Sequence, residues 1–208
     1  MANLDALKEA VQKGKKNDAV ELVKQALAAK TDAREILDNG LIAAMRIIGD
    51  RFSKNEVFVP EMLIAARAMA AALTILEPVL VSQGVEPKGK LVVGTVKGDL
   101  HDIGKNLVAM MLKGAGWQVT DLGVDVPAEK FVSEAEKAGA KFILLSSLLT
   151  TTMPYMKSVV DVVKTQKKDL KVVIGGAPVT QAYADEIGAH GYGKDASDAV
   201  RIVESLAS

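Results

Sequence analysis

The stretch from Gly98 to Asn106 holds the residue types of a ligand site: one imidazole, two carboxylates and two glycines, directly after an apolar run. Residues 90–96 predict a short buried strand, and residues 103–114 predict the helix that follows it. His101 and Asp99 therefore lie on a strand-to-helix turn, where open parallel sheets bind their ligands. A lone histidine in such a turn is more often a surface or hydrogen-bonded residue, so its role depends on the rest of the chain.

Two later segments carry further ligand-binding residue types at predicted strand ends. Residues 146–152 are rich in hydroxyl groups, and residues 175–178 begin with two glycines. Ser146 follows Gly104 after 41 intervening residues, and Gly175 follows Leu148 after 26. Hydroxyls and glycines at strand ends suit a ligand that needs hydrogen bonds and close approach to the backbone.

The second half of the chain alternates short apolar runs with helical patterns, which is typical of βαβ units and a parallel sheet. We predict strands at residues 90–96, 117–122, 141–146, 171–175 and 189–192, and helices at residues 103–114, 128–138, 153–167, 180–187 and 196–206. This pattern indicates an α/β domain, flavodoxin-like (Rossmann-like), with a five-stranded parallel sheet and helices on both faces. In this topology the loops after strands one, three and four open on one edge of the sheet.

The first half predicts an N-terminal four-helix bundle. Apolar residues recur at helical spacing up to about residue 83. Asn3 and Asp32 are predicted N-caps, Glu35 completes a capping box with Asp32, and Pro60 suits the first turn of the fourth helix. Residues 82–89 then have the glycine and proline content of a linker. We therefore expect two domains, residues 1–87 and residues 88–208.

Composition and charge narrow the classes of function. The 26 Lys and Arg residues balance 26 Asp and Glu, and no basic cluster interleaves with aromatic residues, so a nucleic-acid partner is not expected. The most apolar window, residues 59–80, contains Glu61, Arg67 and Glu77, which favours a packed helix over a membrane span. Cysteine is absent and the first residues show no signal-peptide pattern, so we expect a cytoplasmic protein.

Three spaced elements resemble a known signature: Asp99-x-His101-x-x-Gly104, then Ser146-x-Leu148, then Gly175-Gly176. Together they are similar to the motif of the cobalamin-binding domain of methionine synthase and of the small corrinoid proteins of methyltransferase systems. The resemblance extends to residues 94–99, to residues 121–127 and to the helical half, so it covers nearly the whole chain. It implies a cobalamin or related corrinoid cofactor, whose cobalt alternates between cob(I)alamin and methylcobalamin.

The resemblance also implies roles for individual residues. His101 matches the axial ligand of cobalt, Asp99 the carboxylate that orients it, and Thr152 the hydroxyl of the same relay, where methionine synthase has serine. Phe52 and Val59 match apolar residues that cover the upper face of the corrin. The remaining candidates flank the ligand or match the slot for the nucleotide tail: Asp102, Ile103, Gly104, Ser146, Leu148, Thr150, Gly175, Gly176, Gly191 and Tyr192.

Simpler interpretations stay open for several of these residues. Asp102 directly precedes a predicted helix and suits an N-cap. Residues 150–152 also suit a polar helix start, and Phe52 and Val59 also suit ordinary bundle core. Three further polar residues are predicted on the protein surface or, for the first two, beside the nucleotide tail: Lys105, Asn106 and His190.

The function implied by the resemblance is that of a corrinoid methyl carrier. A substrate:corrinoid methyltransferase would supply the methyl group, and a corrinoid:acceptor methyltransferase would pass it to tetrahydrofolate or to a thiol such as coenzyme M. A reductive activase is a further expected partner. The chain has no room for substrate-activating domains, so we expect a subunit of a multi-component methyltransferase, with residues 82–89 as a hinge.

Four other functions share parts of this pattern. The cobalamin-binding subunit of an adenosylcobalamin mutase is disfavoured, because a helical cap would obstruct the adenosyl group. A cobalamin-dependent or light sensor would need an output module. A phosphorelay receiver domain would need an aspartate where the third strand ends in Ser146 and Ser147. A flavin-binding protein is supported by the fold alone.

Overall fold

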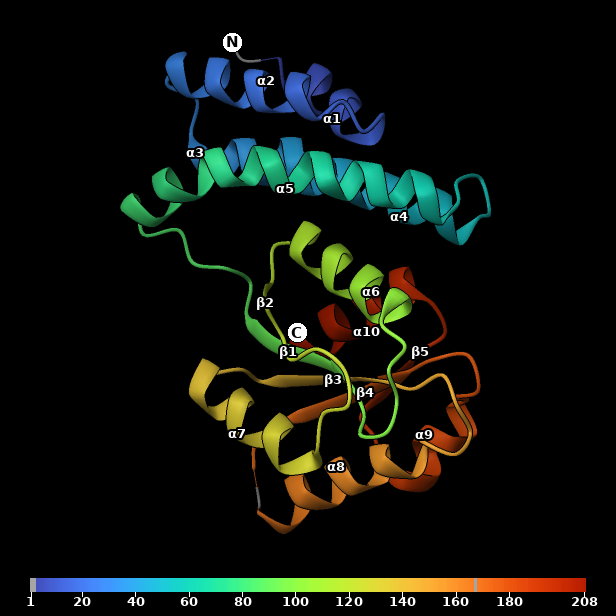
Figure 1. Cartoon of the computed structure of the whole chain (residues 1–208). Helices are drawn as coiled ribbons and strands as arrows, with labels where there is room; N and C mark the ends of the chain where they lie inside the picture. The colour runs from blue at the N-terminus through green and yellow to red at the C-terminus, as the bar shows by residue number, and fades with distance from the viewer. Residues whose placement is uncertain (1–2, 167) are drawn as a thin grey trace. The chain divides into compact units, whose positions relative to one another are not determined.

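The computed structural model describes residues 3–166 and 168–208, and the chain separates into two compact units (Figure 1). One unit comprises residues 1–87 together with 114–116, and the other comprises residues 88–113 and 117–208. The sequence predicts a division between residues 87 and 88, with residues 114–116 in the second domain rather than with the first unit. The predicted last residue of one helix, Lys167, lies outside the described residues.

The helical unit contains the elements α1 (Leu4–Gln12), α2 (Lys16–Ala28), α3 (Ala33–Glu35), η1 (Ile36–Ile42), α4 (Ala43–Ser53) and α5 (Val59–Ser82). The predicted caps are present: Asn3 Oδ1 accepts the N–H of Ala6 at 2.9 Å, and Asp32 Oδ1 accepts the N–H of Arg34 at 2.9 Å. Elements α3, η1 and α4 form one continuous helix whose middle is a π-helix. The π-helix was not predicted; within it, Gly40 lets α1 approach closely, since a Cβ there would lie 2.7 Å from Leu7 Cδ2.

Helix α5 is the one described helix long and apolar enough, by length and composition, to cross a membrane. It packs against α1, α2 and α4 within its own unit. Its buried side chains run along its whole length: Met62, Ala65, Ala66, Ala68, Met69, Ala72, Leu76 and Leu80. This burial supports the interpretation of α5 as the core helix of a bundle.

The second unit contains a five-stranded sheet in the order β2-β1-β3-β4-β5, with every pairing parallel. Its strands are β1 (Lys90–Thr95), β2 (Gln118–Asp121), β3 (Phe142–Ser146), β4 (Lys171–Gly175) and β5 (Gly191–Gly193). Its helices are α6 (Ile103–Gly114), α7 (Ala128–Ala138), α8 (Pro154–Thr165), α9 (Gln181–Ile187) and α10 (Ala196–Ala207). Figure 1 shows α7, α8 and α9 on one face of the sheet and α6 and α10 on the other. The predicted flavodoxin-like fold is confirmed.

The predicted fifth strand is displaced at its start, from residue 189 to Gly191. His190 donates its backbone N–H to the carbonyl of Val172 at 2.7 Å, but the N–H of Val172 donates to His190 Nδ1 at 3.0 Å. A ring nitrogen thus takes the place of a strand carbonyl, and the regular ladder begins one residue later. As predicted, His190 is exposed.

The strand register brings two predicted site residues, Ser146 and Gly175, into one row at the carboxyl edge of the sheet. Thr95 pairs with Ser146, Ser146 with Gly175, and Gly175 with Gly193. The sequence order reverses between β1 and β3, which is the position where sheets of this topology bind ligands. The loops that follow β1, β3 and β4 therefore open together.

Candidate functional site

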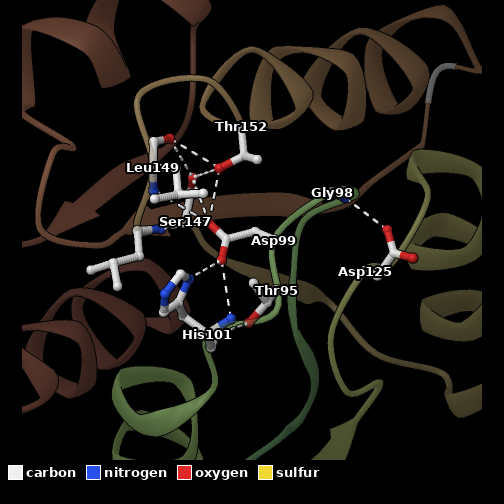
Figure 2. Close-up of polar contacts among 9 residues, drawn as sticks. Thr95, Gly98, Asp99, His101, Asp125, Ser147, Leu149 and Thr152 are labelled. Carbon is white, nitrogen blue, oxygen red and sulfur yellow. Dashed lines mark hydrogen bonds and ion pairs between the residues drawn. The ribbon is translucent and has the colours of Figure 1, made fainter.

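The carboxylate of Asp99 joins the loop after β1 to the loop after β3 (Figure 2). Its side chain is fully buried. Oδ1 accepts the backbone N–H of His101 at 3.1 Å and lies 2.7 Å from the ring Nδ1 of the same residue. Oδ2 accepts the N–H of Leu148 at 2.8 Å, the hydroxyl of Thr152 at 2.8 Å and the N–H of Leu149 at 3.3 Å.

These hydrogen bonds decide the charge of Asp99. Burial raises the pKa of the carboxyl, but the N–H groups of Leu148 and His101, the His101 ring and the Thr152 hydroxyl outweigh burial and hold that pKa well below its usual range. Asp99 is therefore a carboxylate at neutral pH, and a carboxylate can only accept hydrogen bonds. The network assigns the proton of a neutral His101 ring to Nδ1, which leaves a lone pair on Nε2.

Exposed apolar side chains precede and follow His101 in the chain. The side chain of His101 is 52% exposed. Leu100 and Ile103, on either side of it in the loop, are 72% and 76% exposed, and Leu148 and Leu149 are exposed beside Asp99. Large apolar side chains gathered at one edge mark a binding surface.

The described residues include no group of three or more His, Cys, Asp and Glu side chains that could hold a metal ion. The free Nε2 of a neutral His101 ring is one nitrogen ligand, which suits a metal whose other positions are filled by a chelating ring. A corrin is such a ring, and neutral imidazole is a suitable ligand for its cobalt. The donor set fits the cofactor that the sequence implies.

Three predicted site glycines separate into two kinds. A Cβ on Gly176, whose φ is +134°, would lie 1.9 Å from the carbonyl oxygen of Ser147, and a Cβ on Gly175 would lie 2.9 Å from that of Gly193. The fold itself requires these two. A Cβ on Gly104 would meet nothing within 4 Å, and Gly104 lies in the first turn of α6, where glycine costs stability. The packing of the chain therefore gives no reason for the glycine at 104.

The remaining predicted site residues differ in how the structure places them. Ser146 is half-buried and its carbonyl accepts the N–H of Val96 at 3.0 Å. Leu148 reaches the site through its N–H, and Thr150 is exposed. Gly191 has a packing reason, because a Cβ there would lie 2.5 Å from Ile202 Cγ2 on α10. Tyr192 packs against the apolar core and is half-buried.

The start of α6 contains one wrong prediction. Asp102 directly precedes the helix, as expected, and its carboxylate accepts the side-chain amide of Asn106 at 3.0 Å. Lys105 was predicted on the surface or beside the tail; the surface position is wrong, because its side chain is 3% exposed, and the position beside the tail stays a prediction. Its Nζ donates to Asn106 Oδ1 at 2.7 Å and to Asp121 Oδ2 at 2.5 Å. Lys105 lies on the face of α6 that turns toward the end of β2, where a buried ammonium is tolerated because Asp121 balances its charge.

Three residues of the site were missed by sequence reasoning. Ser147 is fully buried, with Oγ 2.7 Å from Thr152 Oγ1. Asp125 Oδ1 accepts the N–H of Gly98 at 2.7 Å, and its own N–H donates to the carbonyl of Asp99 at 3.0 Å. Thr95 donates its hydroxyl to the carbonyl of His101 at 2.8 Å. Two features of the sequence could have pointed to missed residues: the hydroxyl-rich run at 146–152, and the segment 121–127, which contains a glycine and ends in a proline.

The two predicted cap residues belong to the helical unit. Phe52 lies in the last turn of α4 and Val59 is the first residue of α5, and both are half-buried. Phe58, between them in the chain, is 63% exposed. Their role toward a corrin stays a prediction.

Models of known protein families match both halves of the chain. Residues 89–201 match the family model of a B12 binding domain, and residues 4–77 match a second B12 binding domain model. The chain belongs to the B12-binding family. Cobalamin or a related corrinoid is therefore its cofactor.

Relatives within the B12-binding family match the whole chain. A corrinoid protein of Desulfitobacterium hafniense is 40% identical over 211 residues, covering 99% of this chain and 98% of that protein. The dimethylamine corrinoid protein 1 of Methanosarcina mazei is 41% identical over 207 residues, covering 98% of this chain and 95% of that protein.

Two solved structures from the same family share the fold over nearly the full length. A cobalamin-binding protein from Desulfitobacterium hafniense gives a TM-score of 0.82 with 32% identity and covers 99% of this chain and 98% of its own. The methanol:cobalamin methyltransferase complex of Methanosarcina barkeri gives 0.87 with 29% identity, covering 98% of this chain and 79% of the matched chain.

Proposed function

We propose that this protein is a methyl carrier, in which His101 Nε2 is the protein ligand of a corrinoid. When bound, the corrinoid supplies a cobalt that accepts a methyl group from one methyltransferase and releases it to another. The observation that carries the proposal is the pairing of the half-exposed His101 ring with the buried carboxylate of Asp99 at 2.7 Å. Relatives that are named as methylamine corrinoid proteins support it.

The chain itself sets the donor strength of the ligand nitrogen. A proton held at His101 Nδ1 by a charged carboxylate makes Nε2 a stronger electron-pair donor. The Thr152 hydroxyl and the Leu148 N–H, both 2.8 Å from Asp99 Oδ2, draw negative charge away from the carboxylate and moderate this effect. Protonation of Asp99 would weaken the hold on Nδ1–H and with it the donor strength of Nε2.

We also propose a protective role for the helical unit. Apolar side chains at the adjoining ends of α4 and α5, Phe52 and Val59, would shield a bound methyl group from water. Residues 82–89, from the end of α5 to the start of β1, would be the hinge that lets this cap move aside during transfer. The half-burial of both side chains leaves apolar surface available for this role.

The partners follow from the carrier role. A substrate-specific methyltransferase would deliver the methyl group, as the pairing of a similar chain with a methanol:cobalamin methyltransferase suggests. A second methyltransferase would deliver it to tetrahydrofolate or a thiol, and a reductive activase would restore oxidised cofactor. We expect the exchange to take place in the cytoplasm, without a nucleic acid or a membrane.

Methyl transfer through the loaded protein tests the proposal. Protein carrying cobalamin, reduced with a chemical reductant, is mixed in turn with methanol, dimethylamine and trimethylamine methyltransferases and their substrates, and the visible spectrum is followed. We expect methylation with at least one pair, and demethylation on addition of a corrinoid:thiol or corrinoid:folate methyltransferase. If the protein instead supported turnover only with adenosylcobalamin and a mutase partner, the result would favour the alternative function, the cobalamin-binding subunit of a mutase.

A further inference from the structure

We infer that Ser147 is a positioning residue for the ligand histidine, acting through Thr152 and Asp99. Its hydroxyl donates a hydrogen bond to Thr152 Oγ1, so that Thr152 donates its own single hydroxyl proton to Asp99 Oδ2. The inference rests on the proposed role of His101 as the cobalt ligand. It concerns a side chain outside the motif residues that the sequence singled out.

Ser147 lies wholly inside the network (Figure 2). Its side chain is fully buried, and its Oγ lies 2.7 Å from Thr152 Oγ1. Longer contacts join the same oxygen to the carbonyl of Leu149 at 3.2 Å and to Asp99 Oδ2 at 3.4 Å. The contact with Thr152 is the shortest of the three, so it is the preferred partner.

Counting protons decides the direction of each bond. Thr152 has one hydroxyl proton and three possible acceptors at nearly equal distance: Ser147 Oγ at 2.7 Å, Asp99 Oδ2 at 2.8 Å and the carbonyl of Leu149 at 2.9 Å. The Leu149 carbonyl already accepts the backbone N–H groups of Thr152 at 3.1 Å and Met153 at 3.2 Å. Asp99 is charged, and bonds to a charged acceptor are about twice as strong. The Thr152 proton therefore goes to Asp99.

This assignment leaves the oxygen of Thr152 as the acceptor for Ser147. The bonds then run in one direction, from Ser147 to Thr152 and from Thr152 to Asp99 Oδ2, while His101 Nδ1–H donates to Oδ1. Bonds in such a chain polarise one another and strengthen by about 10–30% each. By strengthening the bond from Thr152, Ser147 draws charge from Oδ1 and weakens the bond from His101.

Removing the Ser147 hydroxyl should therefore strengthen the bond between His101 and Asp99. The test is the Nδ1–H resonance of His101 in the cofactor-free protein with 15N-labelled histidine at constant pH. His190, the second of two histidines in the chain, serves as the internal reference. We expect S147A to move the His101 resonance downfield while His190 stays unchanged. S158A, which removes an exposed serine hydroxyl on α8, is the matched control and should move neither.

The variants T152V and S147A/T152V show whether Ser147 acts through Thr152. We expect T152V to move the resonance in the same direction as S147A, and the double variant to move it no further than T152V. S147C keeps the size of the side chain with a weaker donor and should fall between wild type and S147A. The inference is overturned if S147A leaves the His101 resonance unmoved. It is also overturned if S147A shifts that resonance by the same amount in the T152V background as in wild type.

The loaded protein gives a second readout. S147A should raise the equilibrium constant for imidazole ligation, measured as the ratio of the imidazole-bound to the water-bound cobalamin spectrum, about twofold. Because the resonance is read without cofactor, a protein that bound no corrinoid would refute the proposed function while the proton chain remained measurable. A resonance that did not respond would refute the role of Ser147 alone.

Discussion

His101 Nδ1 lies 2.7 Å from Asp99 Oδ1, and this bond joins a fully buried carboxylate to a half-exposed ring. Because of this difference in exposure, the two residues have different roles. The interior of the α/β unit fixes Asp99 through the N–H groups of Leu148 and Leu149 and the Thr152 hydroxyl. Asp99 in turn fixes the ring, whose second nitrogen is left for a ligand.

Replacing Asp99 should weaken cofactor binding far more than an ordinary surface change. We expect D99N to lower the affinity for hydroxocobalamin about 10- to 100-fold, because an amide cannot accept all the donors that converge on this position and leaves the ring less firmly oriented. Equilibrium dialysis measures the affinity. D161N, at an exposed position of α8, is the control. An affinity of D99N equal to that of wild type would remove Asp99 from the site.

The lowered pKa of Asp99 predicts a pH dependence of stability in the cofactor-free protein. A carboxyl whose pKa is lower in the folded state stabilises the fold above its ordinary pKa of 3.8, and this contribution is lost as the pH falls toward the folded-state value. At pH 7 we expect wild type to exceed D99N in free energy of unfolding by about 2–3 kcal/mol.

Urea unfolding from pH 7 to pH 2 measures this difference. The gap should stay constant down to about pH 4 and narrow below it, as wild type loses the contribution of the carboxylate. A gap that grew on acidification would mean that the folded protein holds Asp99 protonated.

Two glycines predict opposite results on substitution by alanine. G104A should leave the free energy of unfolding of the cofactor-free protein unchanged or raise it by up to about 1 kcal/mol, since space is free and alanine favours helix. Cobalamin affinity should fall about tenfold, the equivalent of roughly 1.4 kcal/mol.

G176A should destabilise the fold itself, by more than about 3 kcal/mol, because its backbone conformation is reserved for glycine and the new Cβ would overlap the Ser147 carbonyl. Denaturation and cobalamin titration of both variants separate the two effects. If G104A bound cobalamin as wild type does, the open space at Gly104 would not belong to the cofactor site.

Substitutions of Asp125 should lower the free energy of unfolding to different degrees. Asp125 holds the Gly98 N–H at 2.7 Å from a left-handed conformation with φ of 54°, which aspartate and asparagine tolerate better than most residues. D125A should lower the free energy of unfolding by about 1–2 kcal/mol and loosen the loop that carries Asp99. D125N keeps an acceptor oxygen and should restore most of the loss. Equal stability of D125A and D125N would exclude the hydrogen bond as the cause.

Much of the fold was predictable because its signals are local. Apolar runs predicted all five strands, and N-cap residues such as Asn3 and Asp32 marked helix starts that the structure confirms. The start of β5 was misplaced because the His190 ring substitutes for a backbone carbonyl. The π-helix at Ile36–Ile42 was missed; within it, Gly40 lies against Leu7 of another helix, a contact that the local sequence pattern does not contain.

The site was predictable where it depends on spacing and was missed where it depends on three-dimensional contacts. The resemblance of the spaced motif to that of cobalamin-binding domains implied a relay of Asp99, His101 and Thr152, and the structure joins these three residues by hydrogen bonds. Ser147 and Asp125 are held by partners 5 and 27 residues away whose proximity only the folded sheet creates. Lys105 was placed wrongly for the same reason, since Asp121, its counter-charge, ends another strand.

The visible spectrum of the protein reconstituted with hydroxocobalamin tests the central claim most directly, with H101A and the control H190A measured beside wild type. We predict that wild type and H190A bind the cofactor with the spectrum of an imidazole-ligated cobalt. H101A should bind it more weakly, with the spectrum of water ligation. Wild type that bound no corrinoid would contradict the whole proposal, and identical spectra for wild type and H101A would contradict the role of His101 as the ligand.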